Sequence, residues 1–224
     1  MITNGELVSE IKTDLKAYNK DQHASASYIL QKARGYVEYL LGQRPLTDVY
    51  RDDTIFRELR CFPMQKVKKH KCDIVEFRNC DNIMKSTKKL PPLYNSRVGT
   101  IIVSVTNIDG SIEYRRLKTL NDYKNQQKRQ FGSNFKYYYV SNNYLYLLNS
   151  TEKLVNIVAL FSDESELEDK SECADKEPCK TILEYDFICP EKYESQVKEL
   201  TLQNLLSSYK QIITDENPNL DEAS

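Results

Sequence analysis

The stretch Glu184-Tyr-Asp-Phe-Ile-Cys-Pro-Glu-Lys-Tyr193 joins a strand-like segment, residues 181–188, directly to a helical pattern that begins at Pro190. Proline suits the first position of a helix because the N–H that it lacks would have no partner there. Apolar residues then recur at helical spacing for about six turns. They are Val197, Leu200, Leu202, Leu205, Leu206, Tyr209, Ile212 and Ile213. The stretch therefore predicts a long C-terminal helix with a broad apolar face, which needs more than one neighbour.

Further helices are predicted near the N-terminus. Thr3-x-x-Glu6 fits a capping box, and apolar residues follow it at helical spacing: Leu7, Val8, Ile11, Leu15 and Tyr18. Asp21 can cap a second helix that ends at Gly42, with Pro45 just beyond as a stop signal. Its apolar stripe is Ile29, Ala33, Tyr36, Val37, Leu40 and Leu41. A third, shorter helical pattern over residues 53–60 stops at Pro63.

Residues 98–161 hold a series of strand-like segments between these helical patterns. Asn107-Ile-Asp-Gly110 separates residues 98–105 from 112–117, and Asp-Gly is a strong hairpin signal because both residues tolerate positive φ. Ser141-Asn-Asn143 separates residues 136–140 from 144–148 in the same way. Two more strands are predicted at residues 72–77 and 154–161, and the continuous apolar run of the latter indicates a largely buried strand.

We therefore expect an α+β protein: a helical bundle, made of the N-terminal helices and the long C-terminal helix, with an inserted antiparallel β subdomain. The expected borders place the helical bundle domain in residues 1–65 and 182–224 and the inserted β subdomain in residues 66–162. Residues 163–181 form an acidic exposed loop in this division. Residues 163–177 hold eight Asp or Glu and two Lys without periodicity, which is typical of a mobile segment.

Composition places the chain among ordinary globular proteins. Hydrophobic residues make up 40% of its 224 residues, and the formal net charge is −1. The chain starts without a basic region followed by an apolar run, and no segment approaches the ~18 apolar residues that a membrane span requires. We expect a soluble protein that is not exported and has no membrane partner.

Six cysteines raise the question of disulfide bonds and metal binding. They are Cys61, Cys72, Cys80, Cys173, Cys179 and Cys189. Disulfide scaffolds belong to short secreted chains, so free thiols are expected in a chain of this length without a signal peptide. No pair has Cys-x-x-Cys spacing, and the second ligand pair of a closed zinc site is missing. Cys173, Cys179 and His70 are the candidates for a zinc test, and no metal site is predicted.

The sequence also lacks the signals of catalysis. His23 precedes a helix and His70 lies inside a lysine-rich run, and neither has a nucleophile or carboxylate arrangement beside it. The six glycines are too scattered to form a phosphate-binding loop. We expect a protein that is not an enzyme, with no catalytic residues and no cofactor.

A basic segment is the stronger functional clue. Residues 66–129 hold fifteen Lys or Arg against six Asp or Glu, a local net charge of +9. Three interpretations stay open: contacts to nucleic-acid phosphates, a solvated basic face, or a surface that meets an acidic one on a neighbouring copy, such as residues 163–177. The candidate phosphate contacts are Lys66, Lys68, Lys69, Lys71, Lys85, Lys88, Lys89, Lys124, Lys128 and Arg129.

Tyrosine is unusually frequent, with 16 residues against seven Phe and no Trp. Its large apolar ring and hydrogen-bonding hydroxyl suit surfaces that are partly buried and partly wet. The rings can equally stabilise strands as cross-strand pairs. Both roles fit the tyrosines of the second hairpin, because alternate residues of a strand point to opposite faces; they are Tyr137, Tyr138, Tyr139, Tyr144 and Tyr146.

The order of elements resembles the head–tail connector, or adaptor, proteins of tailed bacteriophages, which form a ring beneath the portal. The features that carry the resemblance are the two N-terminal helices, the β insertion, and the run from Glu184 to Tyr193 into a proline-started amphipathic helix. The Lys-, Asn- and Tyr-rich composition and the two hairpins are most similar to the neck ring proteins of crAss-like podoviruses. The resemblance covers nearly the whole chain.

This resemblance implies a structural virion protein rather than an enzyme. The implied assembly is a homo-oligomeric ring, a dodecamer matched to the portal, that connects portal and head to the tail and extends the DNA channel. The implied partners are the portal protein, neighbouring tail or neck ring proteins, and genomic DNA passing through the lumen. The implied location is the neck or tail of the virion, after assembly in the host cytoplasm. The alternative is a small phage nucleic-acid-binding protein that uses the basic β unit.

Overall fold

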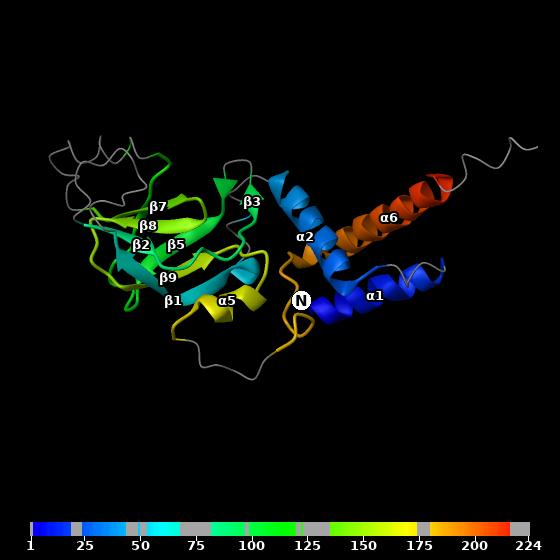
Figure 1. The fold of residues 1–224 in the computed structure, drawn as a ribbon, viewed down its shortest axis with the longest axis horizontal. Coiled ribbons are helices and arrows are strands. Elements are labelled where there is room, and N and C mark those ends of the chain that lie inside the picture. The colour runs from blue at the N-terminus through cyan, green and yellow to red at the C-terminus, as the bar shows by residue number, and fades with distance from the viewer. Residues whose placement is uncertain are drawn as a thin grey trace, which may run out of the picture. The chain divides into compact units, whose positions relative to one another are not determined.

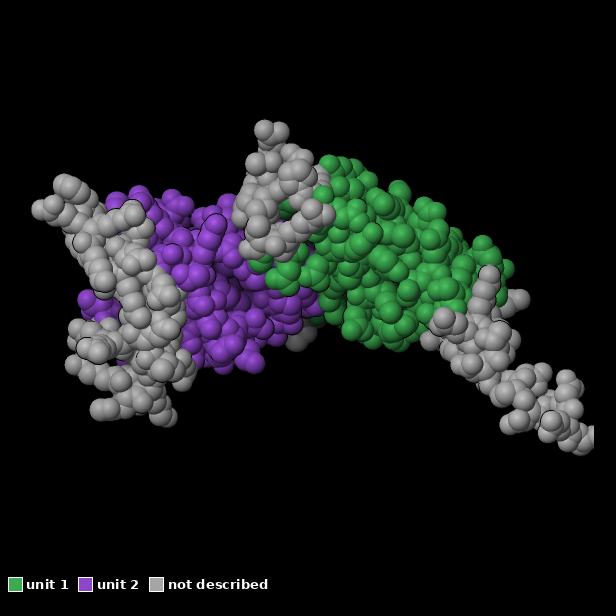
Figure 2. Space-filling view, turned by 90° about the horizontal axis from the view of Figure 1, so that it is seen from above, with its two compact units in different colours: residues 1–55, 95–99, 180–224 green, residues 56–94, 100–179 purple. Residues whose placement is uncertain are grey.

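Helices and a seven-stranded sheet together confirm the α+β class (Figure 1). The chain divides into two units: residues 1–55, 95–99 and 180–224 form unit 1, and residues 56–94 and 100–179 form unit 2 (Figure 2). The computed structural model describes residues 2–18, 24–43, 49, 53–67, 82–96, 99–119, 122, 135–173 and 180–215, with the backbone alone for residues 209–215. The strand expected at residues 72–77 lies outside the described residues.

The first helix of unit 1, α1 (Asn4–Lys16), begins with the predicted capping box. The Thr3 hydroxyl accepts a hydrogen bond from the Glu6 N–H at 3.1 Å, and the Glu6 carboxylate accepts one from the Thr3 N–H at 2.7 Å. These bonds, led by the one from the Thr3 backbone, lower the pKa of Glu6. The predicted stripe is buried except for Tyr18, which lies past the helix end and is 57% exposed.

The second helix, α2 (Ala26–Gly42), ends where the sequence indicated but does not start with Asp21 as its cap. Ser25 is the N-cap, and its hydroxyl accepts a hydrogen bond from the Tyr28 N–H at 3.2 Å. The prediction was wrong because the cap must stand directly before the first helical turn to reach its unpaired N–H groups. The buried stripe is Ile29, Leu30, Ala33, Val37, Leu40 and Leu41, so only Tyr36 of the predicted stripe is not fully buried.

The third helix of unit 1, α6 (Glu191–Asp215), contacts both α1 and α2, and α1 also contacts α2. Val197, Thr201 and Leu205 are buried. Lys198 reaches across to α1, where its Nζ lies 3.2 Å from Glu10 Oε2 and 3.3 Å from Asp14 Oδ2. Burial alone would lower the pKa of Lys198, but the hydrogen bonds and charges of the two carboxylates outweigh burial and raise it. α6 thus follows the predicted long helix, with Pro190 directly before it.

Residues 181–188 do not form the predicted strand. The Glu184 N–H donates to the Thr181 carbonyl in a turn, and a single bridge joins Thr3 to Asp186. A strand needs a strand partner, but the neighbour here is the start of α1, which offers only the few backbone groups that precede or open the helix. Those groups are used: the Gly5 N–H donates to the Leu183 carbonyl at 2.8 Å. A Cβ on Gly5 would lie 3.0 Å from the same oxygen, so any larger residue would push the Leu183 carbonyl away and glycine fits best here.

Unit 2 is built on one sheet whose strand order is β5-β9-β1-β2-β8-β7-β6. β1 pairs with β9 through residues 57–63 and with β2 through residues 64–66. Every pair is antiparallel except β6 with β7, which is parallel and departs from the expected all-antiparallel subdomain. The bounds are β1 (Arg57–Lys66), β2 (Ile83–Ser86), β5 (Ile102–Asn107), β6 (Arg115–Arg116), β7 (Tyr137–Ser141), β8 (Tyr144–Leu148) and β9 (Leu154–Ala159). The chain between β2 and β5 also forms the short pair β3 (Asn95–Ser96) and β4 (Gly99–Thr100).

The segment around β6 nearly closes this sheet into a barrel. Its first part bonds to β5, with the Tyr114 N–H donating to the Val105 carbonyl at 2.9 Å. Its last part bonds to β7, with the Leu117 N–H donating to the Tyr138 carbonyl at 2.9 Å. The buried Tyr114 hydroxyl lies 2.7 Å from Ser150 Oγ, and burial raises the pKa of Tyr114. Closure pairs backbone groups that an open sheet would leave at its edges.

The predicted hairpin at residues 136–148 is present, whereas the one at residues 98–117 forms only a turn with a single bridge between Thr106 and Glu113, and β6 pairs with β7 instead. Asn142 and Asn143 have φ of 51° and 63° between β7 and β8, as a tight hairpin turn requires. Gly110 has φ of 73° in the turn after β5, and the Asn107 N–H bonds back to the Ile112 carbonyl at 3.1 Å. The predicted strand at residues 154–161 is β9, which buries alternate residues rather than its whole length. Its neighbours on both sides, β5 and β1, explain the apolar run.

The prediction of a helix at residues 53–60 is wrong. A single turn of 3₁₀ helix at Asp53–Ile55 is followed directly by β1. Pairing with two strands overrides the local helical pattern, as tertiary context commonly does. Pro63, which the sequence analysis took as a helix stop, lies inside β1 after the register shift between Leu59 and Phe62. Proline is tolerated in strands at such irregular positions.

Residues 163–173 are not the predicted exposed loop. They include the helix α5 (Ser165–Lys170), whose Leu167 is buried. Three contacts hold this segment to the rest of unit 2: an ion pair of 3.0 Å between Arg57 and Glu164, a hydrogen bond of 2.9 Å from Lys88 Nζ to the Asp169 carbonyl, and a disulfide between Cys61 and Cys173. Counting charges alone missed the helix because Leu167 is its single large apolar residue.

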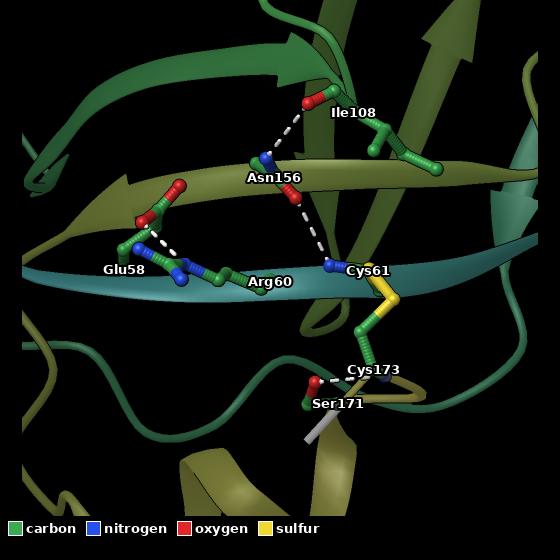
Figure 3. The surroundings of a disulfide bond; sticks show 7 residues. All are labelled: Glu58, Arg60, Cys61, Ile108, Asn156, Ser171 and Cys173. Atoms are coloured by element: carbon green, nitrogen blue, oxygen red, sulfur yellow. Dashed lines mark hydrogen bonds and ion pairs between the residues drawn. A yellow bond between two sulfur atoms is a disulfide. The ribbon is translucent and has the colours of Figure 1, made fainter. Parts of the chain in front are cut away.

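The disulfide also corrects the expectation of free thiols (Figure 3). Cys61 lies at the irregular point of β1 with φ of 50°, and its N–H donates to Asn156 Oδ1 on β9 at 3.0 Å. The Glu172 N–H donates to the Cys61 carbonyl at 3.3 Å, which brings Cys173 beside it. Cys189 is a buried thiol outside the disulfide, and its Sγ–H donates to the Pro190 carbonyl at 3.5 Å. The other three cysteines lie outside the described residues.

Two glycines give a matched test of the packing in unit 1. We predict that Gly5→Ala lowers the free energy of unfolding by about 1–3 kcal/mol, because the new Cβ presses on a backbone oxygen. Gly35→Ala in α2 should raise it by about 1 kcal/mol, since no described atom outside the helix backbone and the two chain neighbours lies within 4 Å of the added Cβ. Urea unfolding followed by circular dichroism measures both. Equal effects of the two changes would contradict the described approach of Leu183 to α1.

The disulfide predicts a redox-dependent stability. It closes a separation of 112 residues, so its loss through Cys173→Ser should lower the free energy of unfolding by about 2–4 kcal/mol. A reductant should weaken the unaltered chain by the same amount and leave the variant unchanged. Peptide mapping without reductant supplies the direct check, and finding both Cys61 and Cys173 alkylated there would disprove the bond.

Candidate functional site

Four of the ten cations singled out in the sequence are described: Lys66, Lys85, Lys88 and Lys89. Lys85 is half-buried, and its Nζ lies 4.4 Å from the Tyr144 ring centroid and 5.4 Å from that of Tyr146. Such cation–π contacts stabilise the sheet surface. Lys88 bonds to the segment that carries α5. These two lysines therefore contribute contacts within unit 2, although Lys88 is exposed, as are Lys66 and Lys89.

The other six candidates lie outside the described residues, as do His23, His70 and Cys179. They are Lys68, Lys69, Lys71, Lys124, Lys128 and Arg129.

The structure adds exposed cations around β6 that the sequence analysis did not single out. The Arg115 guanidinium lies 3.8 Å from the Phe135 ring centroid, and Phe135 is itself 39% exposed. Arg116 donates to the Thr100 carbonyl at 2.8 Å, and Lys118 is exposed nearby in the chain. The signal was present in the sequence as the pair Arg115-Arg116 between two apolar residues, but the strand that presents it is only two residues long.

A pocket of about 350 Å³ opens beside the junction of β1 and β2. Its lining combines the apolar side chains of Met64 and Met84 with Lys66, Lys153 and the polar Ser150. Periodicity could not reveal this pocket, because residues 64–66, 84, 150, 151 and 153 come together only when β1 pairs with β2. The arrangement offers two ammonium groups beside an apolar surface and no acidic group among its lining residues.

The tyrosines of the second hairpin serve mainly the core. Tyr137, Tyr138 and Tyr146 are at most 5% exposed. Tyr137 and Tyr146 join Ile83, Leu117 and Leu148 in one cluster, against which Tyr139 and Tyr144 pack. Tyr139 stands opposite Tyr146 across the hairpin, as expected for cross-strand pairs. Tyr139 and Tyr144 are half-buried, so part of each ring remains in contact with solvent.

The described part of the acidic segment is held within its own unit. Glu164 pairs with Arg57, and the Asp163 carboxylate accepts hydrogen bonds from Ser165. A disulfide and an ion pair thus fix residues 163–173 against β1. Contact of this segment with a neighbouring copy stays a prediction.

The described residues show no cluster of side chains that would form a metal-binding site. No group of three or more His, Cys, Asp or Glu side chains is placed among them to hold a metal ion. Cys173, one of the zinc candidates, is in the disulfide and cannot supply a thiolate. None of the described helices is both long and apolar enough to cross a membrane.

Comparison with known proteins agrees with the resemblance drawn from the sequence. The family model described as "Phage tail ring protein 2", a crAss-like phage family, matches residues 6–222. No curated protein matches the chain. The match spans both units and every helix and strand from α1 to α6. The chain therefore belongs to the phage tail ring protein 2 family of crAss-like phages and is a ring protein of the virion.

Proposed function

We propose that this chain is a structural subunit of a ring in the phage neck that connects the portal and head to the tail and extends the DNA channel. The family match over residues 6–222 is the observation that carries this proposal. A ring subunit acts by its shape and contacts, so it needs rigid units and extensive surfaces rather than a reactive centre. A structural ring family suggests a role without catalysis, and we assign no catalytic, cofactor or metal residue.

Rigidity is built into unit 2. The nearly closed sheet pairs the backbone along β1, β9 and β5, and the Cys61–Cys173 bond ties the α5 segment to β1. A protein that surrounds a DNA channel must keep its form while the genome passes through. Cross-linked, closed sheets resist local opening because few of their hydrogen bonds are left at an edge.

The finer details follow from the resemblance and are part of the proposal. The ring is a dodecamer matched to the portal, its partners are the portal protein and neighbouring tail or neck ring proteins, and the exposed cations of unit 2 face the DNA lumen or the next ring. The subunits assemble in the host cytoplasm and end in the neck or tail of the virion.

We also propose a division into a helical bundle domain and an inserted β subdomain. Helices α1, α2 and α6 contact one another, which suits the bundle. Because β1 belongs to the sheet, we place the first border before Arg57 rather than after residue 65. The acidic segment joins the β subdomain through α5 and the disulfide.

Quantitative mass spectrometry of purified particles tests the proposed function. We predict that the chain is present in a ratio near one to the portal subunit, since the two rings share their symmetry in this proposal. A major capsid protein measured in the same sample calibrates the ratio. Absence of the chain from particles would overturn the proposal.

A nucleic-acid-binding protein is the second candidate, favoured by the exposed Lys66, Lys89, Arg115 and Lys118 of unit 2. Such a protein binds DNA as a monomer, with an affinity that falls steeply as salt rises because condensed counterions are released. A ring subunit by itself should bind DNA weakly. Fluorescence anisotropy with the full-length chain at 50 and 200 mM salt separates the two, and a loss of about 10³-fold would favour the second candidate.

A further inference from the structure

Helix α2 carries a row of residues, exposed except for the half-buried Lys32, on the face opposite its buried stripe. Tyr28, Lys32, Gly35 and Tyr39 are spaced by four, three and four residues, so they form one line along the helix. Their direction is opposite to the buried stripe that faces α1 and α6. Tyr28 is 39% exposed and Tyr39 is 59% exposed.

At the centre of this row, Gly35 leaves a space between the rings of Tyr28 and Tyr39. Beyond the backbone of α2 itself and the two chain neighbours, no atom of the described residues lies within 4 Å of a Cβ built on Gly35, so no described contact requires glycine there. Glycine inside a helix is unfavourable relative to alanine. On one side of this space Lys32 Nζ lies 5.4 Å from the Tyr28 ring centroid. Exposed tyrosines around a small residue form a surface suited to close approach by another chain.

A second surface of unit 1 has the opposite charge. A groove of about 400 Å³ runs between α1 and α6. Four carboxylates and one ammonium line it, which gives a formal charge of −3: they are Glu10, Asp14, Glu194 and Glu199 with Lys198. Leu7 and Leu202 add an apolar part to the lining. No residue of α2 lines the groove, so the groove and the α2 row can be occupied at the same time.

The two surfaces match in chemistry. The Lys32 ammonium and the hydroxyls of Tyr28 and Tyr39 are donors, and the groove carboxylates are acceptors. The tyrosine rings bring apolar area that the leucines of the groove can cover. A ring requires each copy to present two different surfaces that fit one another, because a head-to-tail interface closes only through such a pair.

We propose that the α2 row of one copy docks into the α1–α6 groove of the next copy around the ring. Its occupant is a second copy of this chain, and the Lys32 ammonium of that copy supplies the positive charge that the groove lacks. The contact rests on the proposed function, since it requires that the chain forms a homo-oligomeric ring.

Zero-length coupling of native particles tests this contact. A carbodiimide activates a carboxylate, and the lysine amine then displaces the activating group to form an amide with net loss of one water. We expect peptides in which Lys32 is joined to Glu10, Asp14, Glu194 or Glu199. The dilute full-length chain should not give them, because no residue of α2 lines the groove of its own copy. Lys118 of unit 2 serves as the matched lysine and should give no product with these carboxylates.

Three results would overturn the inference. They are a Lys32 product on another protein's carboxylate, the same Lys32 product in the dilute chain, and particles that contain the chain but yield no coupling of Lys32 to the groove. Mass spectrometry of particles that were not treated with carbodiimide shows whether the chain is present at all. If it is absent, the proposed function fails, and the docking contact is not what has been tested. The two failures are therefore distinguishable.

Charge reversal supplies an independent readout. Lys32→Glu should lower incorporation of the full-length chain into particles by about tenfold, because like charges across an interface are strongly disfavoured. Lys32→Arg should retain incorporation, and Lys118→Glu controls for the charge change. The free Lys32→Glu chain should keep its circular dichroism spectrum and melting temperature, since Lys32 lies on the outer face. Incorporation equal to that of the Lys118→Glu control would contradict the proposed docking.

Discussion

Pairing of β1 with strands on both of its sides is the constraint on which unit 2 depends. Residues 57–63 pair with β9 and residues 64–66 with β2, so one strand joins the β5–β9 part of the sheet to the β2–β8–β7–β6 part. The irregular point at Cys61 lies within the pairing with β9, and there the backbone N–H bonds to Asn156 and the side chain bonds to Cys173. Without β1 the two parts would have exposed edges, and the α5 segment would lose its ion pair and its disulfide.

Local sequence signals predicted the elements whose stability is local. The capping box at Thr3 and Glu6, the asparagine turn between β7 and β8, and the apolar stripes of α1 and α2 depend on residues close in the chain. Elements decided by distant partners were predicted wrongly. Residues 57–60 look helical until β9 is beside them, and residues 181–188 look like a strand until their neighbour proves to be the start of α1.

For the candidate surfaces too, the sequence predicted what depends on nearby residues and missed what depends on distant ones. Net charge identified the basic segment, but the fold decides which lysines serve packing: Lys85 lies over tyrosine rings and Lys88 holds the α5 segment. The pocket at Met64 and Lys153 and the groove between α1 and α6 join residues far apart in the chain, so no sequence pattern could reveal them. The family match gives the class of assembly, and the two opposed surfaces of unit 1 give a physical route by which copies can form it.

The most direct test of the central claim is electron cryo-microscopy of the tails of purified particles. Our account predicts a ring in which every repeat accommodates the α1–α2–α6 unit and the nearly closed sheet, with α2 of each copy against α1 and α6 of its neighbour. A tail whose rings are fully explained by other proteins, with no density that fits these two units, would contradict it.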